Sequence, residues 1–296
     1  MNTYFPGSNV AIITPFTAGG ARIDYDAYRE LLDWQLAAGT DGIVPAGCTG
    51  EAATLSHDEQ KAIIKFTVEH VAGRARVIAG TGSNNTAEAV MLTRYAKEAG
   101  ADGALIITPY YNKPTPEGQF LHFKKIADEV AMPIMLYNVP GRTGVKMSPA
   151  TIARLRRETG NIVSIKEACG SVEQVCDIRA LSDIEILSGD DSLTAPMMAV
   201  GASGVVSVVA NLIPERIKAL CAAASAGDFA TAQKIHYENW ALMKAMFIET
   251  NPICVKTALS LLGKVAFSTR LPLCPATPAT TDALREILAG AGVGQS

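Results

Sequence analysis

Short apolar runs alternate with amphipathic stretches along the first three quarters of the chain. The apolar runs are rich in β-branched residues and bounded by turn residues, which is typical of buried strands, and the stretches between them have helical spacing. Strands are predicted at 10–16, 42–47, 76–82, 104–111, 133–139, 161–168, 184–189 and 204–210. Helices are predicted at 24–38, 56–71, 86–99, after Thr115-Pro116, after Ser148-Pro149, and at 171–180, 193–200 and 213–226.

Eight strand-then-helix units indicate a parallel sheet with helical crossovers, an α/β fold. Within this length they favour a closed (β/α)8 TIM barrel over an open doubly wound sheet. From residue 229 onward only helical patterns occur, at 229–249, 252–262 and 280–289, with Pro272, Pro275 and Pro278 marking the loop before the last one. We therefore expect a catalytic barrel domain at 1–226 and a C-terminal helical extension at 227–296.

Composition narrows the class of protein without naming a function. The 296-residue chain has a net charge of −3 and 48% apolar residues, which argues against a nucleic-acid partner. Neither a cationic leader nor a run long enough to span a membrane is seen, so no membrane partner and a cytoplasmic location are expected. The six cysteines form no C-x-x-C pair, and we expect them to be free and mostly buried.

The run Asn161 to Gly170, N-I-V-S-I-K-E-A-C-G, contains the most informative residue. Strand alternation places Ile162, Ser164 and Lys166 on one face. If that face is the barrel interior, desolvation lowers the pKa of Lys166 and makes its amine a nucleophile near neutral pH. The alternative is a lysine that extends to water or pairs with Glu167.

Other chemistry-bearing residues follow the strands, and in a barrel of this type the C-terminal strand ends form the active-site mouth. A lysine, tyrosine hydroxyls and a glycine-rich turn there could form an imine, move protons and hold a carboxylate, although a single tyrosine is more often a packing residue than a catalytic one. These strand-end groups are Gly47-Cys48-Thr49-Gly50-Glu51, Tyr110-Tyr111, Tyr137-Asn138, Lys166-Glu167 and Gly189-Asp190-Asp191.

Other chemistries find less support. Gly80-Thr81-Gly82 lacks the third glycine of a dinucleotide fingerprint, and no phosphate-binding P-loop occurs, so no cofactor is expected. The four histidines, at 57, 70, 122 and 236, fall in predicted helices without ligand spacing, so no metal site is expected. Asp190-Asp191 would repel a phosphorylated substrate.

Over nearly its whole length the chain resembles the dihydrodipicolinate synthase (4-hydroxy-tetrahydrodipicolinate synthase) family of class I pyruvate-dependent aldolases and lyases. Tyr-Asn-Val-Pro and the lysine strand mark the superfamily, and Arg142, two residues past Pro140, resembles the synthase. The motifs that carry the resemblance are Gly47-Cys48-Thr49-Gly50-Glu51, Thr108-Pro109-Tyr110-Tyr111-Asn112, Tyr137-Asn138-Val139-Pro140-Gly141-Arg142-Thr143-Gly144, Ile165-Lys166-Glu167-Ala168 and Leu187-Ser188-Gly189-Asp190-Asp191.

The resemblance implies condensation of pyruvate with L-aspartate 4-semialdehyde in the diaminopimelate route to lysine. Lys166 would form the Schiff base, and Tyr137 would donate and accept protons. Tyr111 would complete a relay in a neighbouring subunit, with Cys48 in the place where the family usually has threonine. That departure puts the efficiency of the relay in doubt, because a thiol is a weaker hydrogen-bond donor than a hydroxyl.

The resemblance also implies the binding residues. Thr49 would hold the pyruvate carboxylate, Arg142 would bind the aldehyde substrate, and Val206 and Gly189 would complete the substrate pocket. A homotetramer of tight dimers is implied, with lysine as a possible inhibitor. The positions that match the family's lysine site are Ala52, Ala53, His57, Gln60, Asn84, Glu88 and Tyr110.

Two other functions stay open at this point. N-acetylneuraminate lyase or a 2-keto-3-deoxy-sugar-acid aldolase would share Lys166 and Tyr137 but bind a polyhydroxylated chain. A pyruvate-binding sensor without catalysis would also fit, with Cys48 as the sign of a decayed relay.

Overall fold

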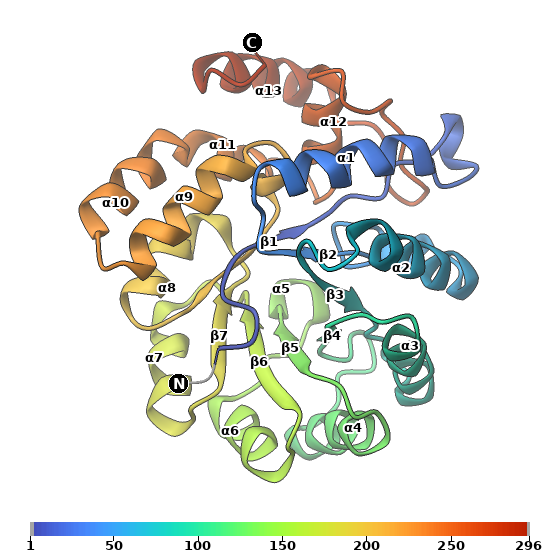
Figure 1. Cartoon of the computed structure of the whole chain (residues 1–296), viewed down its shortest axis with the longest axis vertical. Helices are drawn as coiled ribbons and strands as arrows, with labels where there is room; N and C mark the ends of the chain where they lie inside the picture. Colours follow the sequence, from blue (N-terminus) through green and yellow to red (C-terminus); the bar gives the residue numbers. More distant parts are fainter. Residues whose placement is uncertain (1–2, 295–296) are drawn as a thin grey trace.

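The computed structural model describes residues 3–294 and arranges eight parallel strands in sequence order as a closed barrel. The predicted TIM barrel is therefore confirmed. Figure 1 shows the strands at the centre of the molecule with helices around them. The strands are β1 (Gly7–Ala11), β2 (Gly42–Val44), β3 (Arg76–Gly80), β4 (Gly103–Ile107), β5 (Ile134–Asn138), β6 (Ile162–Glu167), β7 (Glu185–Ser188) and β8 (Gly204–Ser207).

A helix follows each strand, and several begin at side chains that the sequence marks as caps. Ser56 forms the predicted capping box with Glu59, and Thr115 and Ser148 each cap a helix whose first residue is proline. The helices are α1 (Tyr25–Ala37), α2 (His57–Val71), α3 (Thr86–Glu98), α4 (Pro116–Glu129), α6 (Pro149–Glu158), α7 (Val172–Leu181), α8 (Thr194–Ala199) and α9 (Pro214–Ser225), with an unpredicted single turn, α5 (Pro140–Thr143), after β5.

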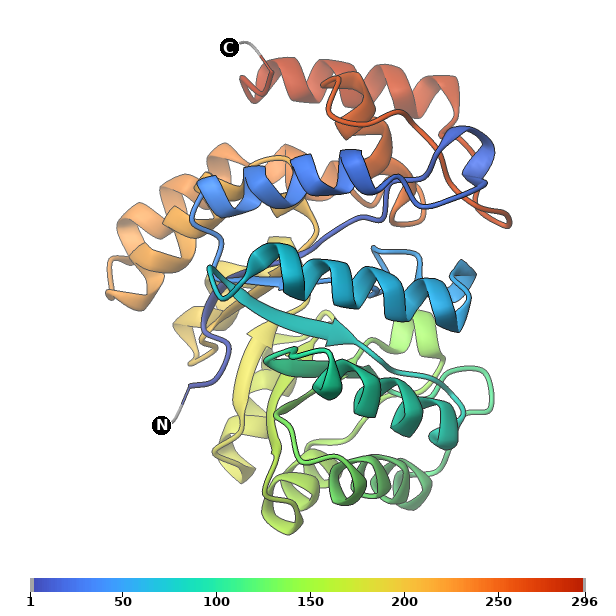
Figure 2. The same ribbon diagram turned by 45° about the vertical axis from the view of Figure 1, so that its right-hand side comes forward.

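The chain after α9 forms four further helices, α10 (Phe229–Glu238), α11 (Trp240–Ala245), α12 (Ile253–Leu261) and α13 (Pro278–Gly290). Figures 1 and 2 show α13 outermost, beyond α1, and α12 packs between α13 and the short turn Val209–Asn211 that follows β8. The prediction of one helical stretch at 229–249 was wrong, because the helix is interrupted at Asn239. The backbone of Asn239 leaves helical geometry (ψ 5°), and its side-chain amide donates to the Ile235 carbonyl at 2.7 Å. Pro278 lies in the first turn of α13 rather than in the loop before it.

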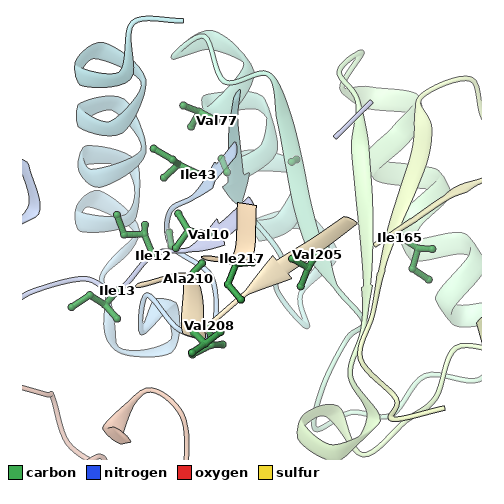
Figure 3. Packing of buried hydrophobic residues seen from close by; sticks show 14 of the residues in the cluster. Val10, Ile12, Ile13, Ile43, Val77, Ile165, Val205, Val208, Ala210 and Ile217 are labelled. Atoms are coloured by element: carbon green, nitrogen blue, oxygen red, sulfur yellow. The ribbon is translucent and has the colours of Figure 1, made fainter. Parts of the chain in front are cut away.

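Both faces of the barrel wall are apolar, as expected of parallel strands covered by helices. On the outer face, Val10, Ile43 and Val77 are aligned partners on β1, β2 and β3, and Figure 3 shows their side chains in a row. On the inner face a smaller cluster fills the barrel, and it includes Tyr137 and Val206. The C-terminal strand ends are thus held on a packed scaffold.

Strand β6 departs from the alternation that the sequence predicts. Ile134 on β5 pairs with Ile162, but the next residue, Met135, pairs with Ser164, so β6 carries one extra residue, a β-bulge at Val163. Val163 consequently belongs to the inner cluster and Ile162 to the outer one. The prediction that Ile162 shares a face with Lys166 was wrong, although Lys166 itself does reach the interior side.

The cysteines are free, as predicted, but most are not buried. Cys221 and Cys254 are buried, Cys48 is partly exposed, and Cys176 and Cys274 lie at the surface. Cys176 lies on the exposed side of α7, and Cys274 lies in the loop before α13. The composition of the chain does not reveal that these two positions face solvent. Across residues 3–294 no helix combines the length and apolar character needed to cross a bilayer.

Candidate active site

Lys166 is buried near the C-terminal end of β6, with 4% of its surface exposed. It is aligned with Tyr137 on β5, and its Nζ lies 4.2 Å from the centroid of the Tyr137 ring. Burial lowers the pKa of Lys166 below its usual value of 10.5, whereas the thiol of Cys48 and the carboxylates of Asp190 and Asp191 act in the opposite direction. A larger fraction of neutral, nucleophilic amine is the consequence.

Tyr137 is also buried, at 6% exposed, and it packs in the inner cluster with Cys48 against it. Burial raises the pKa of its phenol well above 10, and the neighbouring Cys48 side chain adds to that rise. The phenol therefore stays protonated at neutral pH. It can donate a hydrogen bond to a group bound at Lys166 and recover a proton through Cys48.

Gly189 leaves the space that the Lys166 side chain occupies. A Cβ at this position would lie 2.6 Å from the Cβ of Ala168 and 3.0 and 3.1 Å from Cε and Cγ of Lys166. Contacts this short are not tolerated in packed interiors. The sequence placed Gly189 among the substrate-binding residues, and the structure shows it against the stem of the lysine.

The turn after β2 carries Cys48 and Thr49, and a buried ion pair anchors it. Glu51, with a left-handed φ of 55°, receives the ammonium of Lys256 from α12, and both side chains are at most 2% exposed. Lys256 also donates to the Ser268 carbonyl at 2.8 Å. Burial lowers the pKa of Lys256 to about 8, and Glu51 opposes that effect. The C-terminal extension thereby holds an active-site turn in place.

Arg142 lies on α5 at the mouth and lines a cavity of about 420 Å³ together with Cys48 and Tyr137. Its Nη2 donates to the backbone carbonyl of Asn251 at 3.1 Å. Lys166 and Thr49 do not line this cavity themselves, but both are buried next to residues that do, Tyr137 and Cys48. The guanidinium is thus available at the opening, where it could bind a carboxylate.

Asp191 and Val206 shape the opposite side of the barrel. The Oδ2 atom of Asp191 accepts from the amides of Val208 and Val209 at 3.0 and 2.9 Å, which holds the end of β8. Val206 is fully buried in the inner cluster. Asp190 is close enough to Lys166 that the two influence each other's pKa, with burial raising that of Asp190 above its usual value.

Tyr111 does not join this cluster within one chain. It is 89% exposed and adopts a left-handed φ of 69°, which is unusual for an aromatic residue. The preceding Tyr110 is 36% exposed and reaches the cavity wall. A structured loop that presents Tyr111 to solvent has the geometry needed to supply this side chain to another molecule.

Most of the residues predicted to bind lysine line the same cavity. They are Ala52, Ala53, His57, Gln60, Glu88 and Tyr110. Asn84 is outside that wall, and its amide donates to the Tyr110 carbonyl at 3.2 Å. Glu88 accepts from Ser83 at 2.7 Å and lies 3.9 Å from the Nε2 of His57. Gln60 is occupied by the Gly80 carbonyl at 2.9 Å, so it braces the wall.

Two residues of the C-terminal extension were missed by the sequence reasoning. Lys256 could have been noticed, because a charge in the otherwise apolar run of α12 requires a buried partner. Asn251 gives no comparable signal, since asparagine before proline is common in loops. Within residues 3–294 no group of three or more candidate ligand side chains is placed to hold a metal ion.

The family follows from comparison with known proteins. Residues 4–291 match the model of the dihydrodipicolinate synthetase family. The chain belongs to this family. Two curated relatives are both named 4-hydroxy-tetrahydrodipicolinate synthase. The protein of Nitratidesulfovibrio vulgaris (strain DP4) is 53% identical, with 98% of this chain and 99% of that protein covered. The protein of Geobacter sulfurreducens is 54% identical, with 96% and 98% covered.

Solved structures of the dihydrodipicolinate synthetase family superpose closely on this chain. Dihydrodipicolinate synthase from Aquifex aeolicus matches with a TM-score of 0.96 and 48% identity, covering 98% of this chain and 99% of its own. The enzymes from Acinetobacter baumannii, in complex with pyruvate, and from Cyanidioschyzon merolae, with lysine bound, match at 43% and 39% identity. Both have TM-scores of 0.95 and cover 98% of this chain and 99% of their own.

Proposed function

We propose that this chain is a 4-hydroxy-tetrahydrodipicolinate synthase, a lyase that condenses pyruvate with L-aspartate 4-semialdehyde. The observation that carries the proposal is the buried Lys166, whose lowered pKa and contact with the Tyr137 ring suit imine formation. Relatives above 50% identity with this name over nearly their whole length support the choice of substrates.

The reaction begins when the neutral amine of Lys166 attacks the ketone carbon of pyruvate. Loss of water leaves a protonated imine, which withdraws electrons from the adjacent methyl group. Removal of a methyl proton gives an enamine, whose carbon attacks the aldehyde of the second substrate. The amine of that substrate then displaces Lys166, which closes the ring and restores the enzyme.

Proton transfers in this sequence fall to Tyr137 and its neighbours. The phenol of Tyr137 donates to the departing hydroxyl during imine formation, and the neighbouring Cys48 returns the proton. The partner subunit's Tyr111 completes the relay, which accounts for the exposed, left-handed presentation of Tyr111 in a single chain. This role assumes the homotetramer of tight dimers expected from the sequence, in a cytoplasmic enzyme.

Substrate binding divides between two carboxylate holders. Thr49 holds the carboxylate of pyruvate, and Arg142 at the mouth grips the carboxylate of the aldehyde through paired hydrogen bonds. Val206, buried in the inner cluster, and Gly189, against the stem of Lys166, complete the pyruvate pocket. In a 2-keto-3-deoxy-sugar acid the carboxylate lies at the pyruvate end, so the polyhydroxylated end has no carboxylate for Arg142 to bind.

Borohydride reduction in the presence of pyruvate tests the proposal. The wild-type chain should gain a single reduced pyruvate adduct on Lys166, located by peptide mass spectrometry, and Lys166→Arg should gain none. The trapped enzyme should also lose turnover in a coupled assay with pyruvate and aspartate semialdehyde. An adduct on another lysine, or turnover only with N-acetylneuraminate or 2-keto-3-deoxy-sugar acids, would overturn it.

Lysine is the proposed inhibitor, at the cavity lined by Glu88, His57 and Tyr110. The ligand's ammonium would pair with the carboxylate of Glu88, which accepts from Ser83 at 2.7 Å and has acceptor positions left for a further donor. Ala52 and Gln60 replace the serine and histidine of some sensitive members, which predicts weak inhibition. Titration of turnover with lysine up to millimolar concentrations tests this, with Glu88→Gln as the variant that should lose the response.

A further inference from the structure

We propose that Glu167 is a positioning residue that fixes the ends of β5 and β6 against each other and so holds Lys166 beside Tyr137. This inference rests on the proposed function, because it concerns imine formation at Lys166. Glu167 is the last residue of β6 and is fully buried. It follows Lys166 directly, but alternation along the strand turns its carboxylate to the outer face of the barrel wall, under the surrounding helices.

Asn138 on β5 is the strand partner of Glu167, as Tyr137 is the strand partner of Lys166. The Nδ2 atom of Asn138 donates to both carboxylate oxygens of Glu167, at 3.0 Å each. The reacting pair on the inner face is therefore backed by a hydrogen-bonded pair on the outer face, one residue further along the same two strands. Side chains that pair across neighbouring strands stabilise one alignment of those strands.

The bulge in β6 gives this pair a task that the backbone ladder does not perform alone. The extra residue at Val163 shifts the pairing of β5 and β6, so the earlier ladder pairs do not dictate the later ones. A slip by one residue would turn Lys166 to the outer face, because side chains alternate along a strand. The same slip would turn Glu167 away from Asn138, so their hydrogen bonds select the observed register.

The groups around the Glu167 carboxylate are hydrogen-bond donors. Besides Asn138, the backbone N–H of Cys169 donates to Oε1 at 3.0 Å, and Nε2 of Gln174, on α7, donates to Oε2 at 3.5 Å. Burial raises the pKa of Glu167 above its usual 4.5, whereas the hydrogen bonds from these neighbours favour the carboxylate form. Glu167 thus connects β5, the loop after β6 and α7 at one point.

Met147 fixes which way the two amide side chains face. Its N–H donates to Oδ1 of Asn138 at 3.0 Å, and its carbonyl accepts from Nε2 of Gln174 at 3.0 Å. Both amide side chains therefore present N–H groups to Glu167. A glutamine at this position would turn its own NH2 group toward these donors, so Glu167→Gln breaks the network while it nearly preserves the size and shape of the side chain.

The rate of imine formation tests the alignment of Lys166 with Tyr137. The protein is mixed with saturating pyruvate, quenched with borohydride at timed intervals and analysed for the adduct on Lys166. In Glu167→Gln the rate constant of adduct formation should fall about 10–100-fold, because a displacement of about 1 Å can cost on the order of 100-fold. The pyruvate concentration for half-saturation should change little, because Thr49 lies on the turn after β2, outside this network.

Exchange of donor and acceptor separates positioning from a general loss of stability. Asn138→Asp combined with Glu167→Gln restores the donor–acceptor pair in reversed order and should return most of the lost rate. The matched control is Glu185→Gln, at the N-terminal end of β7. Glu185 is 4% exposed and accepts from the amides of Tyr4 and Phe5 at 3.1 and 3.0 Å. That variant should lose stability to urea but keep the rate of imine formation.

Urea unfolding of each variant shows which of them are folded. A wild-type rate in a folded Glu167→Gln would overturn the inference, as would an exchanged pair that does not recover the rate, or equal slowing in Glu185→Gln. If Glu167→Gln does not fold, the exchanged pair decides, because it must then both fold and form the imine at near the wild-type rate. Failure of the proposed function differs from all of these outcomes, since the wild-type protein itself would then form no adduct on Lys166.

Discussion

Removing the ammonium of Lys256 should destabilise the protein more than any surface lysine would. In Lys256→Met the carboxylate of Glu51 stays 99% buried and keeps only the backbone amide of Arg270, at 3.3 Å, while the Ser268 carbonyl loses its donor. Breaking a buried pair by removing one partner costs about 3–5 kcal/mol. Against a total stability of roughly 5–15 kcal/mol, that is a large share.

The magnitude comes from an uncompensated charge, so a second substitution should reverse most of it. Glu51→Gln combined with Lys256→Met leaves two neutral side chains, and replacement of a whole buried pair is often close to neutral. The matched control is Lys65→Met, which breaks a pair of 3.7 Å between side chains that are 59% and 65% exposed. That change should cost less than about 0.5 kcal/mol.

Urea unfolding of the four proteins, followed by circular dichroism, measures these differences. The pyruvate concentration that half-saturates trapping should also rise in Lys256→Met, because the turn of Cys48 and Thr49 loses its anchor. If Lys256→Met unfolds within 1 kcal/mol of wild type, or the double variant is no more stable than the single one, the ion pair does not hold the turn.

Three further predictions concern the mouth, the relay and acid stability. Arg142→Ala should weaken the interaction with aspartate semialdehyde by about 1.5–3 kcal/mol, seen as reduced kcat/KM, while trapping of pyruvate survives; unchanged kinetics would count against its role. Cys48→Ala should lower kcat by about 10²–10⁴-fold and Cys48→Thr should preserve or raise it, whereas full activity of the alanine variant would show that the thiol only fills space. Burial lowers the pKa of His122 from 6.5 to about 4, so the stability contributed by its neutral form is complete above pH 6.5 and lost as pH falls towards 4. The free energy of unfolding in urea should therefore be about 3 kcal/mol lower at pH 4 than at pH 7 because of this group. The difference between the two pH values should shrink in His122→Phe but not in His57→Phe. Equal acid sensitivity in the two variants would contradict the prediction.

The fold could be predicted because its signals are local. Each signal, such as the period of a helix or a cap at Ser56 or Thr115, is contained in a window of about twenty residues. The order of the elements then follows from reading such windows one after another. Strand ends were predicted too long for a related reason. Ile12, Ile13 and Phe16, for example, are buried in the same cluster as Val10 of β1, but they follow the last ladder pair of that strand, Ala11 with Val44.

The candidate site could be predicted only where it coincides with strand ends. Lys166 and Tyr137 lie near the C-terminal ends of β6 and β5, and Arg142 follows β5, so the barrel geometry alone gathers them. Asn251 and Lys256 reach Thr49 and Glu51 across more than two hundred residues, and no local pattern records such contacts. The bulge at Val163 could not be predicted for a different reason. An extra residue in a strand changes which face of the sheet the neighbouring side chains point to, but it leaves the apolar composition of the strand the same.

The placement of Asn251 and Lys256 bears on how this protein can be modified. The segment after α9 is not a separable module, because two of its residues hold the turn after β2. Asn251 donates to Thr49, and Lys256 pairs with Glu51. A shortened protein ending near residue 226 would retain all eight strands yet lose the support of its substrate pocket. Grafting the barrel loops of this protein onto a related barrel should accordingly transfer activity only when residues 249–256 are transplanted with them.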